Sequence, residues 1–204
     1  MAPEGMNSPR IRARAAKLLE LTTRAARGHY RVDGHAGTAQ CIVALAFGYR
    51  FRAGARGPGL CNEYLASLVL TTSNGRPIVA QAEIDQAIRS LRPDMGADHV
   101  ICSAQDPERY LDTYELAIQV RSIMGDYGWE TAELIAHPHH LPRAQAVFAS
   151  LGIETRTSAG VRSIWDRQSS QPWTRSPLRW AIRELVVICL YERRGWLHNA
   201  PGLR

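Results

Sequence analysis

Short apolar runs alternate with helix-like segments along most of this chain, and this alternation restricts its fold more than any other feature. The run over residues 41–47 is continuously apolar, which is typical of a strand buried on both faces. Five strands are predicted, over residues 41–47, 77–80, 98–103, 131–136 and 153–156. Strands that alternate with helices form a parallel sheet covered on both sides. The pattern therefore predicts an α/β fold with a mainly parallel sheet of about five strands.

The helix-like segments carry their own start and stop signals. Asp112, followed three residues later by Glu115, is a capping-box arrangement that begins a helix. Pro142 suits the first turn of a helix, and Gly195 has the position of a C-cap. Helices are predicted over residues 10–26, 60–70, 112–124, 141–151 and 177–194, with one more beginning near residue 81.

The domain organisation is predicted to be one domain with an N-terminal extension. Residues 1–36 form the extension: residues 1–9 are expected to be disordered, and residues 10–26 form a basic amphipathic helix. Such a helix can contact a membrane surface or nucleic acid. The simpler interpretation is that it packs on the domain with a solvated arginine face. Residues 37–204 form the single α/β domain, and residues 158–176 are a long polar and aromatic loop within it.

Nearly all the positive charge of this 204-residue chain is arginine, because Lys17 is its only lysine and the formal net charge is +6. Arginine suits planar, bidentate contacts with phosphate or carboxylate. The basic residues are dispersed and form no nucleic-acid recognition motif, so no nucleic-acid partner is expected.

Cysteine usage and hydropathy indicate a protein of the reduced cytoplasm. No stretch approaches the roughly 20 apolar residues of a membrane span, and no signal peptide is recognisable. The chain is too rich in core residues to need a disulfide framework. Its four cysteines are widely spaced and form no CxxC pair: Cys41, Cys61, Cys102 and Cys189.

Polar side chains follow each of the first four predicted strands. Because the carboxyl ends of parallel strands meet at one edge of the sheet, where ligands bind, these side chains should converge on one cleft. The candidate substrate-binding residues are Gly48, Arg50, Asn62, Gln81, Thr113, His137 and Arg143. The candidate catalytic residues are Glu83, Asp112, Glu115 and His140.

Two of these clusters resemble the signatures of the SanA/YdcF/ElyC-like family, which is catalogued as domain of unknown function 218. Residues 112–115 (Asp-Thr-Tyr-Glu) are similar to its (Asn/Asp/Ser)-Thr-x-Glu motif, and residues 140–144 (His-Leu-Pro-Arg-Ala) to its His-Met-x-Arg-Ala motif. Smaller similarities lie at Phe148, Gly152 and residues 195–197. The resemblance covers about residues 39–197.

This resemblance implies a Rossmann-like three-layer fold with helices on both faces of the sheet. It also implies, in bacteria, a link with cell-envelope or small-molecule metabolism. The chain departs from the family at Leu116, where Asn is usual, and at residues 136–137 (Ala-His), where Thr-Ser is common. A family does not fix a reaction, so the function has to be inferred from the site.

The leading hypothesis is an enzyme that acts on a phosphorylated or otherwise anionic small molecule, most simply a hydrolase. The helix that begins near Leu141 offers free N–H groups to an anion, and Arg143 adds a bidentate grip. His140 would act as a general acid or base with Asp112 or a glutamate nearby. The simpler interpretation is that His140 caps the helix and that Arg143 pairs with Glu115.

Two alternatives use the same cleft. In the first, the protein binds a nucleotide-like ligand without catalysis, with residues 158–176 as a lid and Trp165 or Trp173 stacked on the base. In the second, His137 and its neighbours His139 and His140 hold a catalytic metal, although only His140 belongs to the family signature. The cofactor and the oligomeric state are left open.

Overall fold

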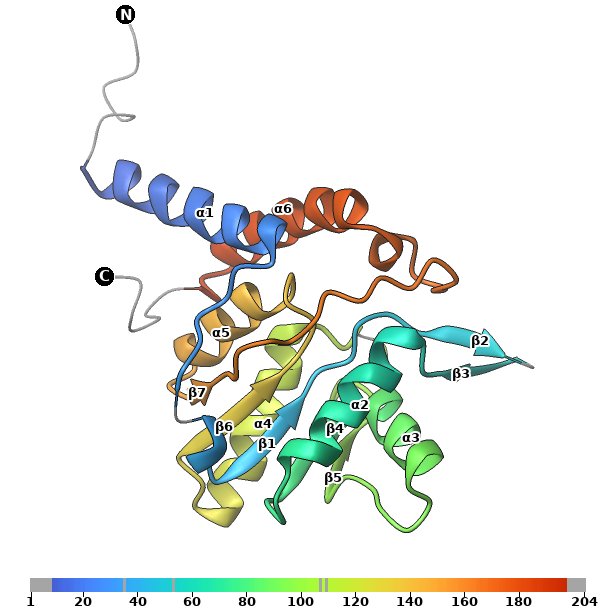
Figure 1. The fold of residues 1–204 in the computed structure, drawn as a ribbon. Coiled ribbons are helices and arrows are strands. Elements are labelled where there is room, and N and C mark those ends of the chain that lie inside the picture. Colours follow the sequence, from blue (N-terminus) through green and yellow to red (C-terminus); the bar gives the residue numbers. More distant parts are fainter. Residues whose placement is uncertain (1–8, 35, 53, 107, 109, 198–204) are drawn as a thin grey trace, which may run out of the picture.

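A five-stranded parallel sheet forms the centre of the molecule in the part of the chain that the structure describes (Figure 1). The structure is a computed structural model that describes residues 9–34, 36–52, 54–106, 108 and 110–197. The strands are β1 (Cys41–Ala44), β4 (Ile78–Gln81), β5 (His99–Ile101), β6 (Thr131–Ile135) and β7 (Glu154–Arg156). Their order is β5-β4-β1-β6-β7, and all neighbours are parallel. The predicted α/β fold is confirmed.

Helices cover both faces of the sheet, as in a Rossmann-like three-layer fold (Figure 1). On one face Ile42 and Ala44 pack with α2 (Leu60–Thr72) and α3 (Ala82–Leu91). On the other face the alternate residues of β1 pack with α4 (Thr113–Tyr127) and α5 (Leu141–Ser150). Successive strand residues point to opposite faces, so an apolar run such as β1 supplies two cores at once.

The N-terminal helix α1 (Pro9–Arg27) lies against the C-terminal helix α6 (Pro177–Arg193) and against α5. Leu21 and Ala25 are buried in the same core cluster as α4 and α5. Arg14 forms an ion pair with Glu192 of α6. The interpretation that this helix packs on the domain is confirmed. Disorder was predicted for residues 1–9; residues 1–8 lie outside the described residues, and Pro9 already belongs to α1.

The first strand ends at Ala44, three residues earlier than predicted. From Ala46 onwards, side chains accept the backbone hydrogen bonds that a neighbouring strand would otherwise accept. The Ala46 N–H donates to Gln81 Oε1 at 2.7 Å, and the Phe47 N–H donates to Asn62 Oδ1 at 2.8 Å. These bonds turn the backbone out of the sheet while satisfying its polar groups. The segment after β1 is therefore held by side chains from β4 and α2.

The glycine- and arginine-rich segment after β1 lies outside the five predicted strands, yet it is regular structure. The segment forms an antiparallel hairpin of β2 (Arg50–Arg52) and β3 (Ala55–Gly57). Gly54, with φ +80°, supplies the left-handed residue that such a turn requires. Arg50 donates two hydrogen bonds, of 2.7 and 2.6 Å, to the carboxylate of Asp166 in the long loop. The hairpin is thereby tied to that loop.

Two short helical turns complete the described elements: η2 (Ala36–Thr38) and η3 (Pro172–Arg175). The second lies inside the predicted long loop and leads into α6. Among the described residues, no helix is long and apolar enough to cross a membrane.

Candidate functional site

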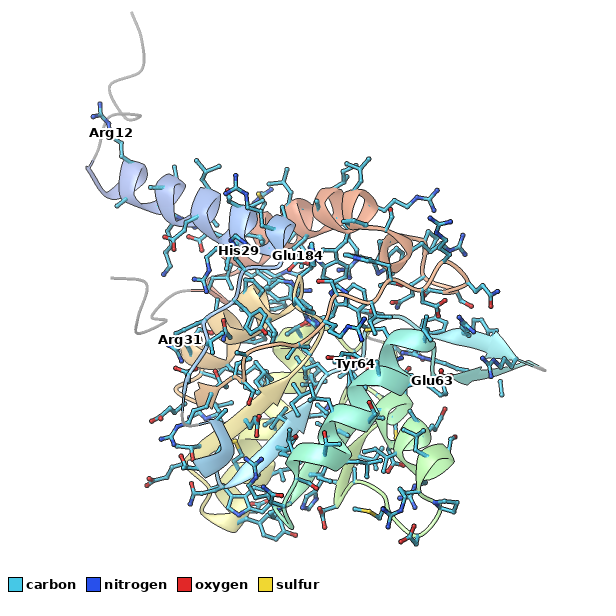
Figure 2. All side chains as sticks on the ribbon, viewed as in Figure 1. Arg12, His29, Arg31, Glu63, Tyr64 and Glu184 are labelled. Atoms are coloured by element: carbon cyan, nitrogen blue, oxygen red, sulfur yellow. The ribbon has the colours of Figure 1, made fainter. Side chains whose placement is uncertain are left out.

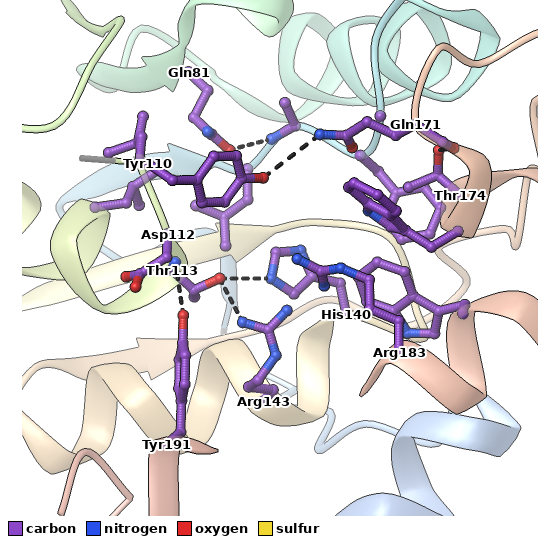
Figure 3. Close-up of a pocket in the computed structure, with 18 residues that line it drawn as sticks. Gln81, Tyr110, Asp112, Thr113, His140, Arg143, Gln171, Thr174, Arg183 and Tyr191 are labelled. Carbon is purple, nitrogen blue, oxygen red and sulfur yellow. Dashed lines mark hydrogen bonds between the residues drawn. The ribbon is translucent and has the colours of Figure 1, made fainter. Parts of the chain in front are cut away.

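A cavity lies at the carboxyl end of the sheet, next to the point where the strand order changes direction (Figure 3). β1 lies between β4 and β6, so the connections that leave β1 and β6 diverge and leave room there. The cavity has a volume of about 60 Å³, which suits a small ion and its water. Its polar lining comprises Gln81, Tyr110, Asp112, Thr113, His140, Arg143, Gln171, Thr174, Arg183 and Tyr191. The predicted convergence of four strand-end segments is therefore present.

Thr113, the first residue of α4, joins the polar groups at the base of the cavity. Its Oγ1 accepts a hydrogen bond from Arg143 Nη1 at 2.7 Å and lies 3.1 Å from His140 Nε2. Its backbone N–H donates to the hydroxyl of Tyr191 at 3.1 Å. The two motifs, which lie about one strand and one helix apart in the sequence, thus meet at one hydroxyl group.

Arg143 is held in place by α6. Its Nε donates to Glu184 Oε1 at 2.7 Å, and its guanidinium lies 5.3 Å from the centre of the Tyr191 ring. Glu184 points from α6 into the interior (Figure 2) and is 1% exposed, while Arg143 is 3% exposed. Burial alone would lower the pKa of Arg143, but the charge and hydrogen bond of Glu184, together with Tyr191 and Asp112, outweigh it and raise that pKa. Arg143 is therefore a fixed cation.

Arg183 also lines the cavity and is less well compensated. Its guanidinium lies 5.0 Å from the ring centre of Trp173 and 5.5 Å from that of Trp180. The nearest carboxylate oxygen, Glu184 Oε2, is 4.0 Å away, and no hydrogen bond joins Arg183 to another residue in the described ranges. Burial lowers the pKa of Arg183, and the positive charge of Arg143 lowers it further.

His140 is a neutral imidazole at the start of α5. Burial lowers its pKa well below the ordinary value, and the charges of Arg143 and Arg183 act in the same direction. We assign its proton to Nδ1, because Nε2 can then accept the Thr113 hydroxyl proton while Thr113 Oγ1 accepts from Arg143. Nδ1 is buried and has no partner among the described residues.

The simpler interpretation of these two residues is wrong in both parts. His140 is the N-cap residue of α5, but its side chain makes no capping hydrogen bond. Arg143 pairs with Glu184 and not with Glu115. Both side chains line the cavity and contact Thr113, and neither helix capping nor an ion pair with Glu115 holds them there.

The remaining predicted catalytic residues do not gather around His140. Asp112 lines the cavity, but its Oδ1 caps α4 by accepting from the N–H groups of Tyr114 and Glu115 at 2.9 and 3.0 Å. The carboxylate of Glu115 accepts from the Gln105 N–H and does not line the cavity. Glu83 forms an ion pair with Arg56 and lines a neighbouring cavity instead. Asp112 is thus the one predicted acid at this cavity.

The predicted substrate-binding residues divide in the same way. Gly48, Gln81, Thr113 and Arg143 line the cavity. Asn62 is buried and holds the backbone of the first connection through Phe47 and Gly48. Arg50 is bound to Asp166, and His137 does not line the cavity.

His137 and His139 form an aromatic cluster with the long loop. The His137 ring stacks on Phe47 with ring centres 3.8 Å apart, and Trp165 contacts both histidines. Burial lowers the pKa of His137 well below its ordinary value. In the described part of the chain, no group of three or more His, Cys, Asp or Glu side chains could hold a metal ion. Trp165 is likewise committed to packing, whereas Trp173 lines the cavity.

Sequence reasoning missed the contribution of α6 and did not single out Tyr110, Gln171 or Thr174, although residues 158–176 were expected to cover the cleft. The cavity is also lined by Tyr110, Gln171, Thr174, Arg183 and Tyr191. Glu184 accepts a hydrogen bond from Arg143 and so holds that side chain in place. One signal was present in the sequence: Glu184 lies on the same helical face as Trp180, Ile188 and Tyr191. A carboxylate on an apolar helix face must find a cation, which could have pointed to Arg143.

Comparisons with protein-family models, with curated proteins and with solved structures find no match to this chain. The similarity to the SanA/YdcF-like signatures therefore depends only on the motif residues of this sequence, chiefly those around Thr113 and around His140 and Arg143.

Proposed function

We propose that this chain binds a phosphorylated or otherwise anionic small molecule in the central cavity and acts on it as a hydrolase. One observation carries the proposal: the guanidinium of Arg183 faces the cavity without a hydrogen-bond partner in the described chain. Glu184 Oε1 accepts from Arg143, while Glu184 Oε2 lies 4.0 Å from Arg183, beyond hydrogen-bond distance; Asp112 Oδ1 accepts from the backbone of α4. Partly buried guanidinium donors that lack an acceptor favour a charged, oxygen-rich ligand.

The low pKa of Arg183 supports an anionic ligand. A depressed pKa means that the surroundings disfavour the positive charge, since burial and Arg143 together outweigh Glu184. An anion placed between the two guanidinium groups would offset this penalty. The cavity volume of about 60 Å³ suits the anionic group of a ligand rather than a nucleotide base, and the Trp173 ring is already covered by Arg183.

A proton path from the cavity to His140 supports a hydrolytic reaction. Thr113 Oγ1 lines the cavity and has one lone pair left after it accepts from Arg143. For a phosphate monoester, the oxygen of an attacking water would bond to phosphorus as the bond from phosphorus to the ester oxygen breaks. The water would give its proton to Thr113 while Thr113 passes its own proton to His140 Nε2, and the departing alkoxide would take a proton from solvent, to which His140 later returns its own. The positive charges that lower the pKa of His140 come from Arg143 and Arg183. A bound anion would oppose them, so His140 becomes a better base once substrate is present.

We also propose a distant relationship to the SanA/YdcF-like family. The contact of Thr113 with both His140 and Arg143 supports it, because the residues that carry the resemblance form one hydrogen-bonded group. The Leu116 position, where the family usually has Asn, is buried and apolar here. The four free cysteines suit a reducing compartment, which supports the expected cytoplasmic location.

The proposed function is tested by separating binding from turnover. Calorimetric titration with inorganic phosphate should show binding that Arg183→Gln weakens roughly 10- to 150-fold, the value of one lost charge-assisted contact. The matched control is Arg179→Gln, an exposed arginine on the same helix, which should bind phosphate like the unchanged chain.

Turnover is then measured with p-nitrophenyl phosphate, a simple phosphate monoester. His140→Asn should lower kcat by roughly 10²- to 10⁴-fold while leaving phosphate affinity within a few-fold. Phosphate binding without hydrolysis of any phosphate monoester would support the non-catalytic alternative. Equal phosphate affinity in Arg183→Gln and the unchanged chain would contradict the proposal as a whole.

A further inference from the structure

A second cavity adjoins the first and is larger. Its volume is about 230 Å³, against about 60 Å³ for the first. It is lined by Arg56, Glu83 and the segment that follows β5, which includes Cys102 and Ser103. The residues that line both cavities are Ala46, Gly48, Gln81, Tyr110, Leu111 and Gln171. The two cavities are therefore adjacent and share one wall at the carboxyl end of the sheet.

Tyr110 and Gln171 separate the two compartments. Gln171 Nε2 donates to the Tyr110 hydroxyl across 3.5 Å, as Figure 3 shows. A bond of this length is at the weak end of the range, so a ligand that spans both compartments can displace it at little cost. Tyr110 is 61% exposed, which leaves its ring free to move aside.

The second compartment differs from the first in its charge. Arg56 forms an ion pair with Glu83 and also lies 4.2 Å from the ring centre of Tyr49, so its charge is compensated. Gln81 Oε1 is used by the Ala46 N–H, which leaves the Gln81 amide N–H groups for a ligand. The Ser103 hydroxyl is exposed, and no hydrogen bond from it to another described residue is present. The compartment thus offers neutral donors and a balanced ion pair.

We propose that the two cavities are subsites of one cleft: the first holds the anionic group and the second holds a neutral, hydroxyl-rich body, as in a sugar phosphate. This inference rests on the proposed function, because it assigns the anion to the Arg143 and Arg183 cavity. Gln81 lines both compartments and would contact the atoms that link the two parts of the ligand. Hydroxyl groups both donate and accept hydrogen bonds, so they suit the neutral amide and hydroxyl groups on this wall.

Cys102 provides a direct readout of the second subsite. It is exposed and lines this cavity, whereas Cys41 and Cys61 are buried. The other exposed thiol, Cys189, lies on α6 and lines neither cavity. In a Cys189→Ser background, the rate of reaction with a thiol reagent therefore reports on Cys102. In the Cys102→Ser variant it reports on Cys189, which is the matched control.

The experiment compares inorganic phosphate with glucose 6-phosphate. We expect saturating glucose 6-phosphate to slow the Cys102 reaction several-fold, inorganic phosphate to leave it unchanged, and excess phosphate to reverse the protection. Neither ligand should alter the reaction of Cys189. Ser103→Ala should weaken glucose 6-phosphate binding roughly 2- to 12-fold, the value of one hydrogen bond, with phosphate affinity unchanged.

Two results would overturn the two-subsite assignment but not the anion site. The first is that inorganic phosphate by itself slows the reaction of Cys102. The second is that the chain binds inorganic phosphate but not glucose 6-phosphate. Absence of phosphate binding would instead refute the proposed function, so the two failures can be told apart. Unchanged labelling of Cys102 with bound glucose 6-phosphate would place the sugar outside the second cavity and would also overturn the inference.

Discussion

Glu184→Gln tests how the cavity is built, because this residue compensates the buried cation Arg143. Glutamine keeps the size and one oxygen acceptor, so the substitution removes the charge and little else. Both partners are almost fully buried, with exposures of 3% and 1% for the two side chains. Breaking such a pair by neutralising one partner costs about 3–5 kcal/mol. For a chain of this length, that corresponds to a fall in Tm of about 6–20 °C.

The assay is urea unfolding with and without inorganic phosphate. We expect phosphate to stabilise Glu184→Gln more than the unchanged chain, since the anion replaces a missing negative charge between Arg143 and Arg183. At a phosphate concentration 100 times Kd, the gain is about 2.7 kcal/mol. The control is Glu154→Gln, whose carboxylate pairs with Arg156 at the surface and is 60% exposed. That variant should lose about 0–1 kcal/mol. Equal stability losses in the two variants would refute the account of Glu184.

Two further predictions concern residues in and next to the cavity. The pKa values of His137 and His140 are well below the ordinary 6.5, so the unfolded chain binds protons that the folded chain does not. The free energy of unfolding therefore has its full value above pH 6.5 and falls below that pH, by about 1.4 kcal/mol per pH unit for each histidine. Urea unfolding at a series of pH values measures this slope. His140→Asn should lower the slope by the contribution of one histidine. Gly48→Ala should cost more than the roughly 1–3 kcal/mol of left-handed strain alone, because its Cβ would lie 2.5 Å from Thr174 Oγ1. Gly152→Ala, which has the same strain at φ +78° and no neighbour within 4 Å, is the control, and an equal loss in both would contradict the packing of Gly48.

The sequence predicts the sheet well because a strand that is buried on both faces is a continuous run of apolar residues, which can be recognised locally. Continuous apolar runs such as the one at Cys41 and capping residues such as Asp112 are visible without any tertiary information. The hairpin after β1 was missed for the opposite reason. Its strands are short and rich in Arg and Gly, and its position is fixed by the contact of Arg50 with Asp166, more than 100 residues away.

The site was predicted in part, and the division follows the same logic. The topological rule placed Gln81, Thr113, His140 and Arg143 at one cleft, because strand ends converge whatever the side chains do. Which acid approaches which base is a question of tertiary packing. Glu184 reaches Arg143 from the last helix, and no spacing within either motif encodes that contact.

The central claim is that Arg143 and Arg183 form an anion site with Thr113, and a crystal soaked in tungstate tests it most directly. Tungstate has the shape and charge of phosphate, and its tungsten atom is located by anomalous scattering. The account predicts one strong peak in the central cavity, with oxygens at hydrogen-bond distance from the Arg183 guanidinium and Thr113 Oγ1. An empty cavity, with tungstate bound only at exposed arginines such as Arg179, would contradict it.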